Sequence, residues 1–558
     1  MKGVIKYMSN KLQEIANAVF PNIDLTIKDL ENKYPKRKLE DDAIVTRFAP
    51  SPTGFLHTGS LFTSLVSYRF AKQTGGVFFL RLEDTDQKRE IKGSGDKVVE
   101  QLETFCIFPD ESYLDEDTPY GPLIQSKRKN IYHTVIKEMI ARGDAYPCFC
   151  SHEELAETRK YQEENKFLPG YYGEFATCRN LSEDDVLEHL NNGEEYVVRF
   201  KSNGKENERV SFKDAIRGDI EFPENILDIV IMKGDKLPTY HFAHVVDDHF
   251  MRTTHITRGE EWMSSAPIHL ELFDRLGWQR PIYAHYPVIM KLDEGKRRKL
   301  SKRKDEEASV DYFLEKGYPI EGFIEYLMTL ANSNFEEWRI QNPQADVFDF
   351  ELSFNKMSLD GALFDIEKIK SISKDRLSLM DAATFTDNAL EYAKQYEPKL
   401  QALIELNRSY FEAIINIGRD QKKPRKDHEK YSDVFDFVSF MYDKYFYEMI
   451  QVLPFNERYE PLLIKEILNE YIHDTGLDLE QNEWFNNMKE KAVKRNFAAR
   501  PKDYKKNPEQ YIGHVGDYAE IIRIAACGKP DTPNFYDILK ILGEERVIER
   551  IKYTKNLL

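Results

Sequence analysis

The feature that most constrains the fold is a strand–turn–helix–strand pattern near the start of the chain. Residues 43–48 (AIVTRF) are rich in β-branched side chains and predict a strand, and the Pro-Ser-Pro-Thr-Gly that follows excludes both a helix and a continued central strand. Apolar residues recur at helical spacing from Gly59 to Lys72, and after a Gly-Gly pair residues 77–82 (VFFLRL) predict a second strand. The segment therefore predicts a βαβ unit, which binds ligands where its first strand ends.

Strand and helix patterns alternate up to about residue 290, with residues 195–200 and 226–232 as the clearest further strands. Beyond about residue 375 the apolar residues repeat at about 3.6 positions, as in residues 434–442 and 462–468. The sequence therefore predicts an α/β part followed by an all-α part.

Charge and composition exclude several classes of protein. The formal net charge of -17 excludes a chain whose whole surface binds nucleic acid or an anionic membrane, so any basic site must be local. No apolar run reaches the length of a membrane helix, and the first 32 residues are polar and mixed in charge, so we expect neither a membrane segment nor export. The odd number of cysteines, five, does not suggest a disulfide framework, and we expect a reducing, cytoplasmic location.

Two stretches carry the chemistry. Residues 47–61 (RFAPSPTGFLHTGSL) place two glycines and His57 where the first strand gives way to the helix, whose N-terminus offers unpaired amides to phosphate. Residues 291–304 (KLDEGKRRKLSKRK) hold eight basic side chains against two acidic ones. Taken alone, the first is compatible with a capping histidine and the second with a solvated surface loop; together they indicate a site for a polyphosphate.

The first stretch resembles the HIGH signature of class I aminoacyl-tRNA synthetases, present as residues 57–60 (HTGS), and the second resembles KMSKS, present as residues 299–303 (KLSKR). The flanking RFAPSPTG resembles the glutamyl-tRNA synthetase family in particular. Further similar motifs follow in the family's order: RLEDTD at 81–86, PTY at 238–240, VDDH at 246–249, RGEEW at 258–262 and LGW at 276–278. The resemblance covers the chain from about residue 43 to its end.

The resemblance implies a Rossmann-type parallel sheet with an inserted acceptor-binding domain, followed by a helical stem-contact and anticodon-binding region. The implied domains are an N-terminal extension or linker without assigned chemistry (1–42), the two halves of the catalytic domain (43–122 and 241–290), the inserted domain (123–240), the KMSKS loop with the stem-contact domain (291–375) and the anticodon-binding domain (376–558).

The reaction that the resemblance implies has two steps: glutamate and ATP form glutamyl-adenylate and pyrophosphate, and the glutamyl group is then transferred to the 3′ end of tRNA(Glu). Such phosphoryl chemistry requires positioning and charge neutralisation, with Mg²⁺ on the phosphates. His57, Gly59, Lys299 and Lys302 are the expected catalytic residues. The expected ATP-binding residues are Thr53, Gly54, His57, Gly59, Ser60, Glu261, Trp262, Lys299, Ser301 and Lys302.

A glutamate pocket needs arginines for the carboxylates and an acid for the ammonium group. By resemblance, Arg47 and Arg258 bind carboxylates, Glu83 binds the ammonium group and Tyr240 donates a hydrogen bond. Glutamine would leave an arginine unpaired in a buried site, which favours glutamate. At His244 the sequence departs from the family, which often has asparagine there. The expected glutamate-binding residues are Arg47, Ser51, Glu83, Tyr240, His244 and Arg258.

Three of the five cysteines, Cys148, Cys150 and Cys178, lie close together in the sequence and suggest a structural zinc site, since some members of the family carry zinc in the inserted domain. Tyr172 is the expected fourth ligand and His152 is its rival. Buried or free thiols are the alternative.

The expected partners are tRNA(Glu), glutamate and ATP, bound by a monomer. The insert would face the acceptor end of the tRNA and the helical half its anticodon. Glutaminyl-tRNA synthetase is the nearest alternative, although Ser51 and Thr53 resemble the glutamate branch. The long helical half disfavours a shortened relative that modifies a tRNA base and a small-molecule nucleotidyltransferase. The joint presence of both signatures disfavours an inactive RNA-binding scaffold.

Overall fold

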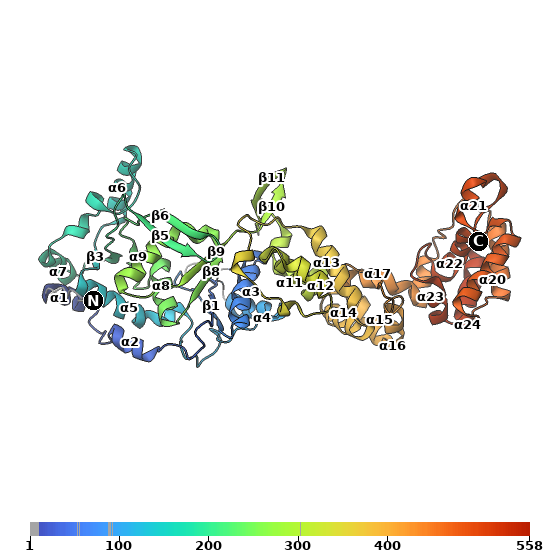
Figure 1. Cartoon of the computed structure of the whole chain (residues 1–558), viewed down its shortest axis with the longest axis horizontal. Coiled ribbons are helices and arrows are strands. Elements are labelled where there is room, and N and C mark those ends of the chain that lie inside the picture. The colour runs from blue at the N-terminus through green and yellow to red at the C-terminus, as the bar shows by residue number, and fades with distance from the viewer. Residues whose placement is uncertain (1–9, 53, 55, 87–90, 92, 302) are drawn as a thin grey trace. The chain divides into compact units, whose positions relative to one another are not determined.

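The structure is a computed structural model that describes residues 10–52, 54, 56–86, 91, 93–301 and 303–558 (Figure 1). It divides into two compact units. The first contains the described residues up to Tyr312 together with Ile324–Asp365, and the second contains Phe313–Phe323 and Ile366–Leu558. The division falls inside the segment 291–375, and the finer domain bounds stay predictions. Within the described residues, none of the helices combines the length and the apolar character that crossing a bilayer requires.

The predicted βαβ unit is confirmed. β1 (Val45–Phe48) and β2 (Val77–Leu80) pair in parallel, and α3 (Thr58–Gln73) connects them. Both strands are buried almost throughout, as expected for a parallel sheet covered on both faces. β8 (His255–Gly259) lies beside β1, since the Thr254 amide donates to the Val45 carbonyl at 3.0 Å.

Next to β8 lies β9 (Ile282–Tyr286), which is parallel to it. Next to β9 lies a hairpin that the sequence analysis placed in the inserted domain. This hairpin, β5 (Arg209–Asp214) and β6 (Gly218–Pro223), joins β9 through the pair Asp214 and Tyr283. Part of the predicted insert therefore extends the catalytic sheet (Figure 1).

The other strands of the insert form a separate antiparallel sheet in the order β3, β4, β7. The predicted strands at 195–200 and 226–232 appear there in shorter form, because their first residues precede the paired segments. The bounds are β3 (Ala145–Cys148), β4 (Val197–Phe200) and β7 (Val230–Met232), and the helices that flank the sheet in sequence are α6 (His152–Glu164) and α7 (Glu183–Asn191).

The N-terminal segment is bound to the first unit rather than extended away from it. Its helices are α1 (Asn10–Val19) and α2 (Ile27–Lys33), and α1 packs against α5 (Lys129–Arg142) and α7. After α2, the guanidinium of Arg37 forms a two-point ion pair with Glu111 at 2.6 and 3.0 Å. The part of the extension expected to be a linker is therefore anchored by charge-assisted hydrogen bonds.

Residues 324–365 complete the first unit. The Arg69 guanidinium of α3 donates to the carbonyls of Phe348 and Phe350, the latter at 3.1 Å, and the Gln73 amide donates to the Leu352 carbonyl at 2.9 Å. The remaining elements of this unit are α4 (Ser94–Thr104), α8 (Tyr240–Phe250), α9 (Ala266–Leu276), β10 (Met290–Asp293), β11 (Lys296–Lys299) and α12 (Phe335–Gln341); α10 (Val310–Lys316) and α11 (Ile320–Ala331) contain the points of division.

The second unit is helical, as predicted, apart from one two-stranded pair, β12 (Phe497–Ala498) and β13 (Gly513–His514). Its buried apolar residues form a large cluster from Leu377 to Ile551, and the Tyr431 amide donates to the carbonyl of Gly317 at 2.7 Å. The helices are α13 (Ile366–Leu379), α14 (Ala382–Tyr396), α15 (Pro398–Leu406), α16 (Arg408–Ile415), α17 (Val434–Val438), α18 (Asp443–Met449), α19 (Pro461–His473), α20 (Gln481–Lys494), α21 (Pro501–Lys506), α22 (Val515–Cys527), α23 (Phe535–Leu542) and α24 (Glu544–Leu557).

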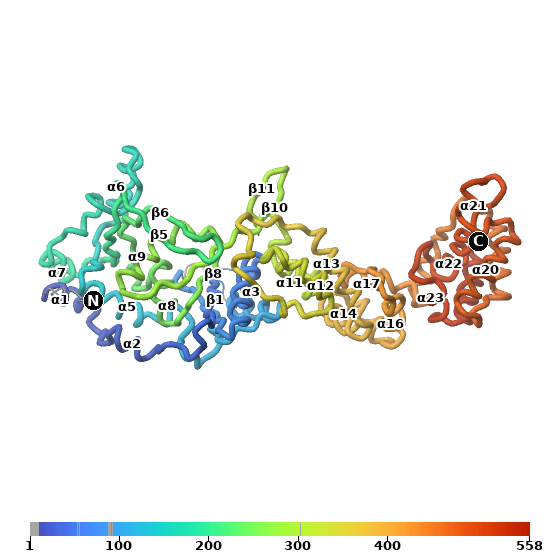
Figure 2. The backbone as a smooth tube through the Cα atoms, in the orientation of Figure 1, coloured from blue at the N-terminus to red at the C-terminus, as the bar shows by residue number. Residues whose placement is uncertain are grey.

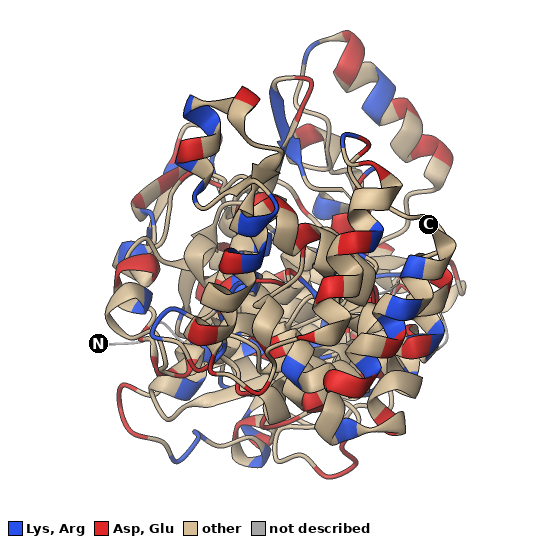
Figure 3. Cartoon of the chain, turned by 90° about the vertical axis from the view of Figure 1, so that its right-hand side faces the viewer, with Lys and Arg blue, Asp and Glu red and all other residues tan. Residues whose placement is uncertain are grey.

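The backbone trace shows the β10–β11 hairpin projecting from the first unit (Figure 2). Basic and acidic residues are interspersed along the helices that face the viewer in Figure 3.

Candidate active site

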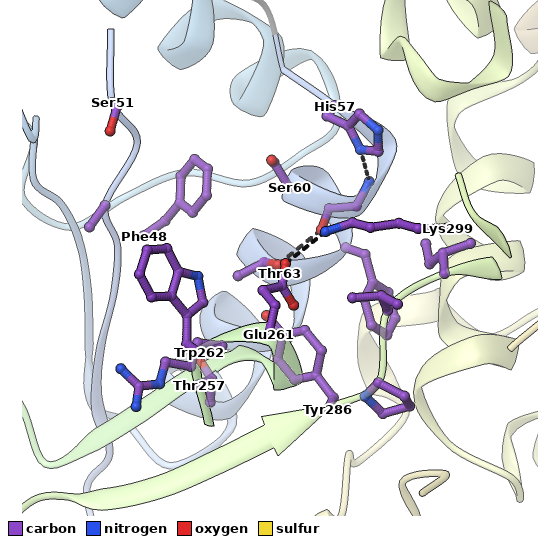
Figure 4. Close-up of a pocket in the computed structure, with 18 of the residues that line it drawn as sticks. Phe48, Ser51, His57, Ser60, Thr63, Thr257, Glu261, Trp262, Tyr286 and Lys299 are labelled. Carbon is purple, nitrogen blue, oxygen red and sulfur yellow. Dashed lines mark hydrogen bonds and ion pairs between the residues drawn. The ribbon is translucent and has the colours of Figure 1, made fainter. Parts of the chain in front are cut away.

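A cavity of about 390 Å³ opens in the first unit where β1 and β8 end and α3 begins (Figure 4). Its volume lies within the usual range for small-molecule sites. Of the predicted site residues, those at its wall are Arg47, Ser51, His57, Gly59, Ser60, Glu83, Tyr240, Arg258, Glu261, Trp262 and Lys299.

The turn at His57 prepares the start of α3 for an anion. His57 is the N-cap residue, and its Nδ1 accepts a hydrogen bond from the amide of Gly59 at 2.8 Å. A Cβ at Gly59 would lie 3.1 Å from that same Nδ1, so a glycine fits here best. The helix N-terminus contributes its partial positive charge at the cavity wall.

The segment that follows the basic stretch lies against this turn. The Thr58 hydroxyl donates to the Glu307 carbonyl at 2.8 Å, and His57 forms an isolated antiparallel bridge with Ser309. Two regions about 250 positions apart in the sequence therefore meet beside the cavity, as the polyphosphate hypothesis requires.

The basic stretch forms the β10–β11 hairpin, and its charges are partly paired. Lys299 contacts Glu261 across the cavity at 2.9 Å (Figure 4), and Arg298 forms a two-point ion pair with Asp305 at 2.6 and 2.8 Å. Arg298 thereby lowers the pKa of the Asp305 carboxyl. Lys299 keeps 56% of its side chain exposed and remains within reach of a ligand. Lys302 lies outside the described residues.

A buried network of arginines and acids forms another part of the wall. Asp248 accepts from Arg47 at 3.1 Å and from Arg81 at 2.7 Å, and Arg81 also contacts Glu83 at 3.0 Å. Burial alone would raise the pKa of Asp248, but the charges of Arg47 and Arg81 outweigh burial and lower it. For Glu83, burial prevails and the pKa is raised.

Sequence reasoning assigned no role to Arg81 or Asp248. The signal was present, because α8 is an apolar helix that carries two adjacent acids, Asp247 and Asp248, and buried carboxylates require cationic partners. Asp247 accepts from Arg128 at 2.6 Å in the same way.

Arg258 differs from these arginines because no described carboxylate pairs with it. Its Nε contacts His285 at 2.8 Å and its Nη1 contacts His269 at 3.3 Å, while its buried Nη2 has no hydrogen-bond partner among the described residues. The rings of Tyr240 and Trp262 pack nearby at a tilt, with centroids 4.6 Å apart, and burial raises the pKa of Tyr240 to about 12.

Some predicted residues lie elsewhere. His244 is fully buried behind Tyr240, where its Nδ1 contacts Asp248 at 3.0 Å, and it is not part of the cavity wall. Gly54 and Ser301 are also away from the wall. Thr53, like Lys302, lies outside the described residues. The wall residues to which the sequence analysis gave no role are mostly apolar or hydroxylic. Phe48, Ala49, Gly259 and Leu300 stand inside the quoted motifs, and no motif marks the others: Phe62, Thr63, Thr257, Tyr286, Pro287, Val288 and Ile289.

The three cysteines Cys148, Cys150 and Cys178 meet in the insert, with their sulfur atoms within 4.8 Å of one another. The fourth group beside them is the hydroxyl of Tyr171, which lies 3.2 Å from Cys150 and 3.5 Å from Cys148. Tyr172, the residue expected from the sequence, instead packs edge-on against Phe175. His152 begins α6 and is not part of the cysteine group.

The donor set fits a tetrahedral Zn²⁺ site, which prefers thiolate ligands and accepts an oxygen. Hydrogen bonds within the group lower the pKa of Cys148 and raise the pKa of Cys178, so they favour a single thiolate, at Cys148.

Comparison with known protein families gives two matches. Residues 43–370 match the family described as tRNA synthetases class I (E and Q), catalytic domain. Residues 509–555 match the family described as anticodon binding domain.

Relatives and solved structures agree. Glutamate–tRNA ligase from Acetivibrio thermocellus is 45% identical over 97% of this chain and 99% of its own length, and that from Clostridium beijerinckii is 44% identical over 98% and 100%. A crystal structure of a glutamate tRNA ligase from Elizabethkingia meningosepticum superposes with a TM-score of 0.73 at 27% identity, covering 92% of this chain and 99% of that one. On the strength of this full-length similarity, the chain belongs to the glutamate–tRNA ligase family of class I tRNA synthetases.

Proposed function

We propose that the cavity beside α3 is the place where this chain activates glutamate with ATP and then transfers the glutamyl group to tRNA. The observation that carries the proposal is that the His57 turn, Lys299 and the arginines Arg47 and Arg258 line one cavity. A site for phosphates and a site for carboxylates are thereby adjacent, as the joining of the two substrates requires.

The ATP phosphates fit the end of the cavity formed by His57, the start of α3 and Lys299. When the α-carboxylate of glutamate attacks the α-phosphorus, the bond to the leaving pyrophosphate breaks and charge grows on the phosphate oxygens. Lys299 could exchange its partner Glu261 for these oxygens, because both side chains are about half exposed and therefore mobile enough to rearrange. Mg²⁺, when bound to the phosphates, would neutralise further charge.

Glutamate fits the end formed by the arginine network. Arg258 offers an unpaired buried donor to a carboxylate, Arg47 offers a second cation, and Glu83 offers a carboxylate to the ammonium group. Glutamine would leave a buried arginine without its charge partner. Each charged hydrogen bond lost in this way weakens binding by about 1.5–3 kcal/mol. After activation, a ribose hydroxyl of the tRNA 3′ end attacks the glutamyl carbonyl and AMP leaves.

We further propose that Cys148, Cys150, Cys178 and Tyr171 hold a structural Zn²⁺ in the insert. The ion would connect β3 to the segment at 171–178 and thereby order a small region that has few buried apolar residues of its own. The insert would then face the acceptor end of tRNA(Glu), and the second unit, which contains the anticodon-binding match, would contact the anticodon. The monomeric state and the cytoplasmic location stay predictions of the sequence.

Aminoacylation tests the function directly. We expect the purified chain to attach labelled glutamate, and not glutamine, to tRNA(Glu) with consumption of ATP. A separate assay with tRNA(Gln) measures whether the enzyme also attaches glutamate to that tRNA. Arg258→Leu should abolish activity, whereas Arg280→Leu, at a partly exposed arginine on the same unit, should leave it unchanged. Activity with glutamine equal to that with glutamate would contradict the proposed pocket.

A further inference from the structure

The orientation of Arg258 is set by groups that are not part of the cavity wall. Arg258 is 5% exposed, and its neighbours His285 and His269 are fully buried. His285 is in turn bound by Asp214, whose Oδ2 lies 2.7 Å from His285 Nδ1. Asp214, His285 and Arg258 therefore form a continuous hydrogen-bonded series from the β5–β6 hairpin to the cavity.

The series has one consistent arrangement of hydrogens. A guanidinium has only donors, so His285 Nε2 at 2.8 Å from Arg258 Nε must carry a lone pair. The proton of the neutral ring is then on Nδ1, where it is donated to the Asp214 carboxylate. Burial, followed by the charge of Arg258, lowers the pKa of His285, which agrees with a neutral ring.

Asp214 is held in place by its own strand and by its turn. Its Oδ1 accepts from the amides of Ile216 and Arg217 at 3.0 Å each, and the adjacent Ala215 amide donates to the Tyr283 carbonyl at 2.8 Å. The position of the carboxylate is therefore determined by the pairing of β5 with β9, and it can select the tautomer of His285.

A second imidazole holds the other side of the guanidinium. His269 Nδ1 lies 3.3 Å from Arg258 Nη1, and its Nε2 lies 3.0 Å from His241 Nδ1. With Nε and Nη1 directed to two neutral acceptors, Nη2 is the nitrogen that remains unpaired, and Arg258 is at the cavity wall. Because the acceptors carry no charge, the positive charge of Arg258 is left for a substrate carboxylate.

We propose that Asp214 and His285 are positioning residues for glutamate recognition: Asp214 fixes the tautomer of His285, and His285 holds the Arg258 guanidinium so that its free edge meets a carboxylate of the substrate. This inference rests on the proposed glutamate pocket and adds to it two residues that do not touch the substrate. A carboxylate in place of His285 would neutralise Arg258, whereas a neutral imidazole orients the guanidinium and leaves its charge available.

The test compares His285→Leu with His285→Gln, measured by aminoacylation with tRNA(Glu). Leucine fills the space without an acceptor, whereas the glutamine amide oxygen can accept from Arg258 Nε. We expect His285→Leu to raise the KM for glutamate by about 10- to 100-fold, the effect of losing one hydrogen bond to a charged group, with the KM for ATP unchanged within about twofold. His285→Gln should recover most of the loss. His255→Leu, on the neighbouring strand β8, is the matched control and should leave both KM values unchanged.

Asp214→Asn tests whether Asp214 selects the tautomer of His285. It also provides an independent test of the proposal if His285→Leu does not fold. An amide nitrogen facing His285 Nδ1 would place the ring proton on Nε2, against the Arg258 donor, and should raise the KM for glutamate in the same way. The inference is overturned if the KM for glutamate is unchanged in either folded variant, or if the KM for ATP rises equally and the melting temperature falls, since that indicates a general structural role. A wild-type chain that does not charge tRNA with glutamate would instead refute the proposed function.

Discussion

Replacing Asp248 by asparagine should destabilise the first unit more than any single charge change on its surface. The Asp248 carboxylate is fully buried and contacts Arg47, Arg81 and His244 at 3.1, 2.7 and 3.0 Å. Asparagine keeps the shape but removes the negative charge, so two buried guanidinium groups lose the partner that they share. Removing one partner from a buried ion pair costs about 3–5 kcal/mol.

This loss translates into a lower melting temperature. For a unit of this size, the usual entropy of unfolding per residue converts 3–5 kcal/mol into a fall of about 4–7 °C. The assay is calorimetric unfolding of the full chain, in which the transition of the first unit is the one that added ATP shifts upward. Asp274→Asn is the matched control, because Asp274 forms an ion pair with Arg280 but is 51% exposed, and such pairs contribute about 0–1 kcal/mol.

The pH dependence provides a second measurement on the same variant. Because the pKa of Asp248 is lowered in the folded state, its contribution to stability is present above the ordinary aspartate pKa of about 3.9 and is lost as the pH falls further. Asp248→Asn should therefore unfold with a weaker acid dependence below about pH 4 than the wild type. Equal melting temperatures for Asp248→Asn and Asp274→Asn would refute the conclusion that the buried ion pairs of Asp248 with Arg47 and Arg81 stabilise the first unit.

Three further predictions concern the cavity, the cysteine group and His249 of α8, whose ring contacts Glu31. Lys299→Ala should lower kcat by about 10²- to 10³-fold with a smaller effect on the KM for glutamate, measured by pyrophosphate exchange with tRNA present, and Lys302→Ala should behave similarly. Tyr171→Phe should weaken zinc binding measured by competition with a chelator, whereas Tyr172→Phe should not; equal effects would remove Tyr171 as a ligand. Burial lowers the pKa of His249 to about 4, so its contribution to folding should be lost as the pH falls from about 6.5 towards 4, and thermal unfolding of His249→Phe should be less acid-sensitive in that window.

The local fold around the phosphate site could be predicted because its signals are local. Prolines, glycines and apolar spacing within residues 43–82 predict two strands and the helix between them, and the structure confirms these three elements. The pairing of β5 with β9 could not be predicted in the same way, because it depends on contacts between residues about 70 positions apart, which no local pattern specifies.

The residues of the candidate site likewise differ in whether a local motif reveals them or only the folded structure does. Arg47, His57 and Lys299 stand in recognisable motifs and do reach the cavity. His244 was expected there because it replaces a residue of the family motif, but its position on α8 directs the ring toward Asp248. The fourth group at the cysteines is Tyr171 and not its neighbour, since one step along an extended segment turns the side chain to the opposite side.

Because the first unit is completed by residues 324–365, the chain cannot be truncated cleanly at one peptide bond. A fragment that stops at Tyr312 would lose the carbonyls that accept from Arg69 and Gln73 on α3. A fragment that stops at Asp365 would keep them, but it would carry the segment Phe313–Phe323, with its two stacked phenylalanine rings, without the rest of the second unit to which this segment belongs. A single cut therefore divides one of the units, and exchange of the whole second unit for that of another chain calls for three crossover points, at 312/313, 323/324 and 365/366.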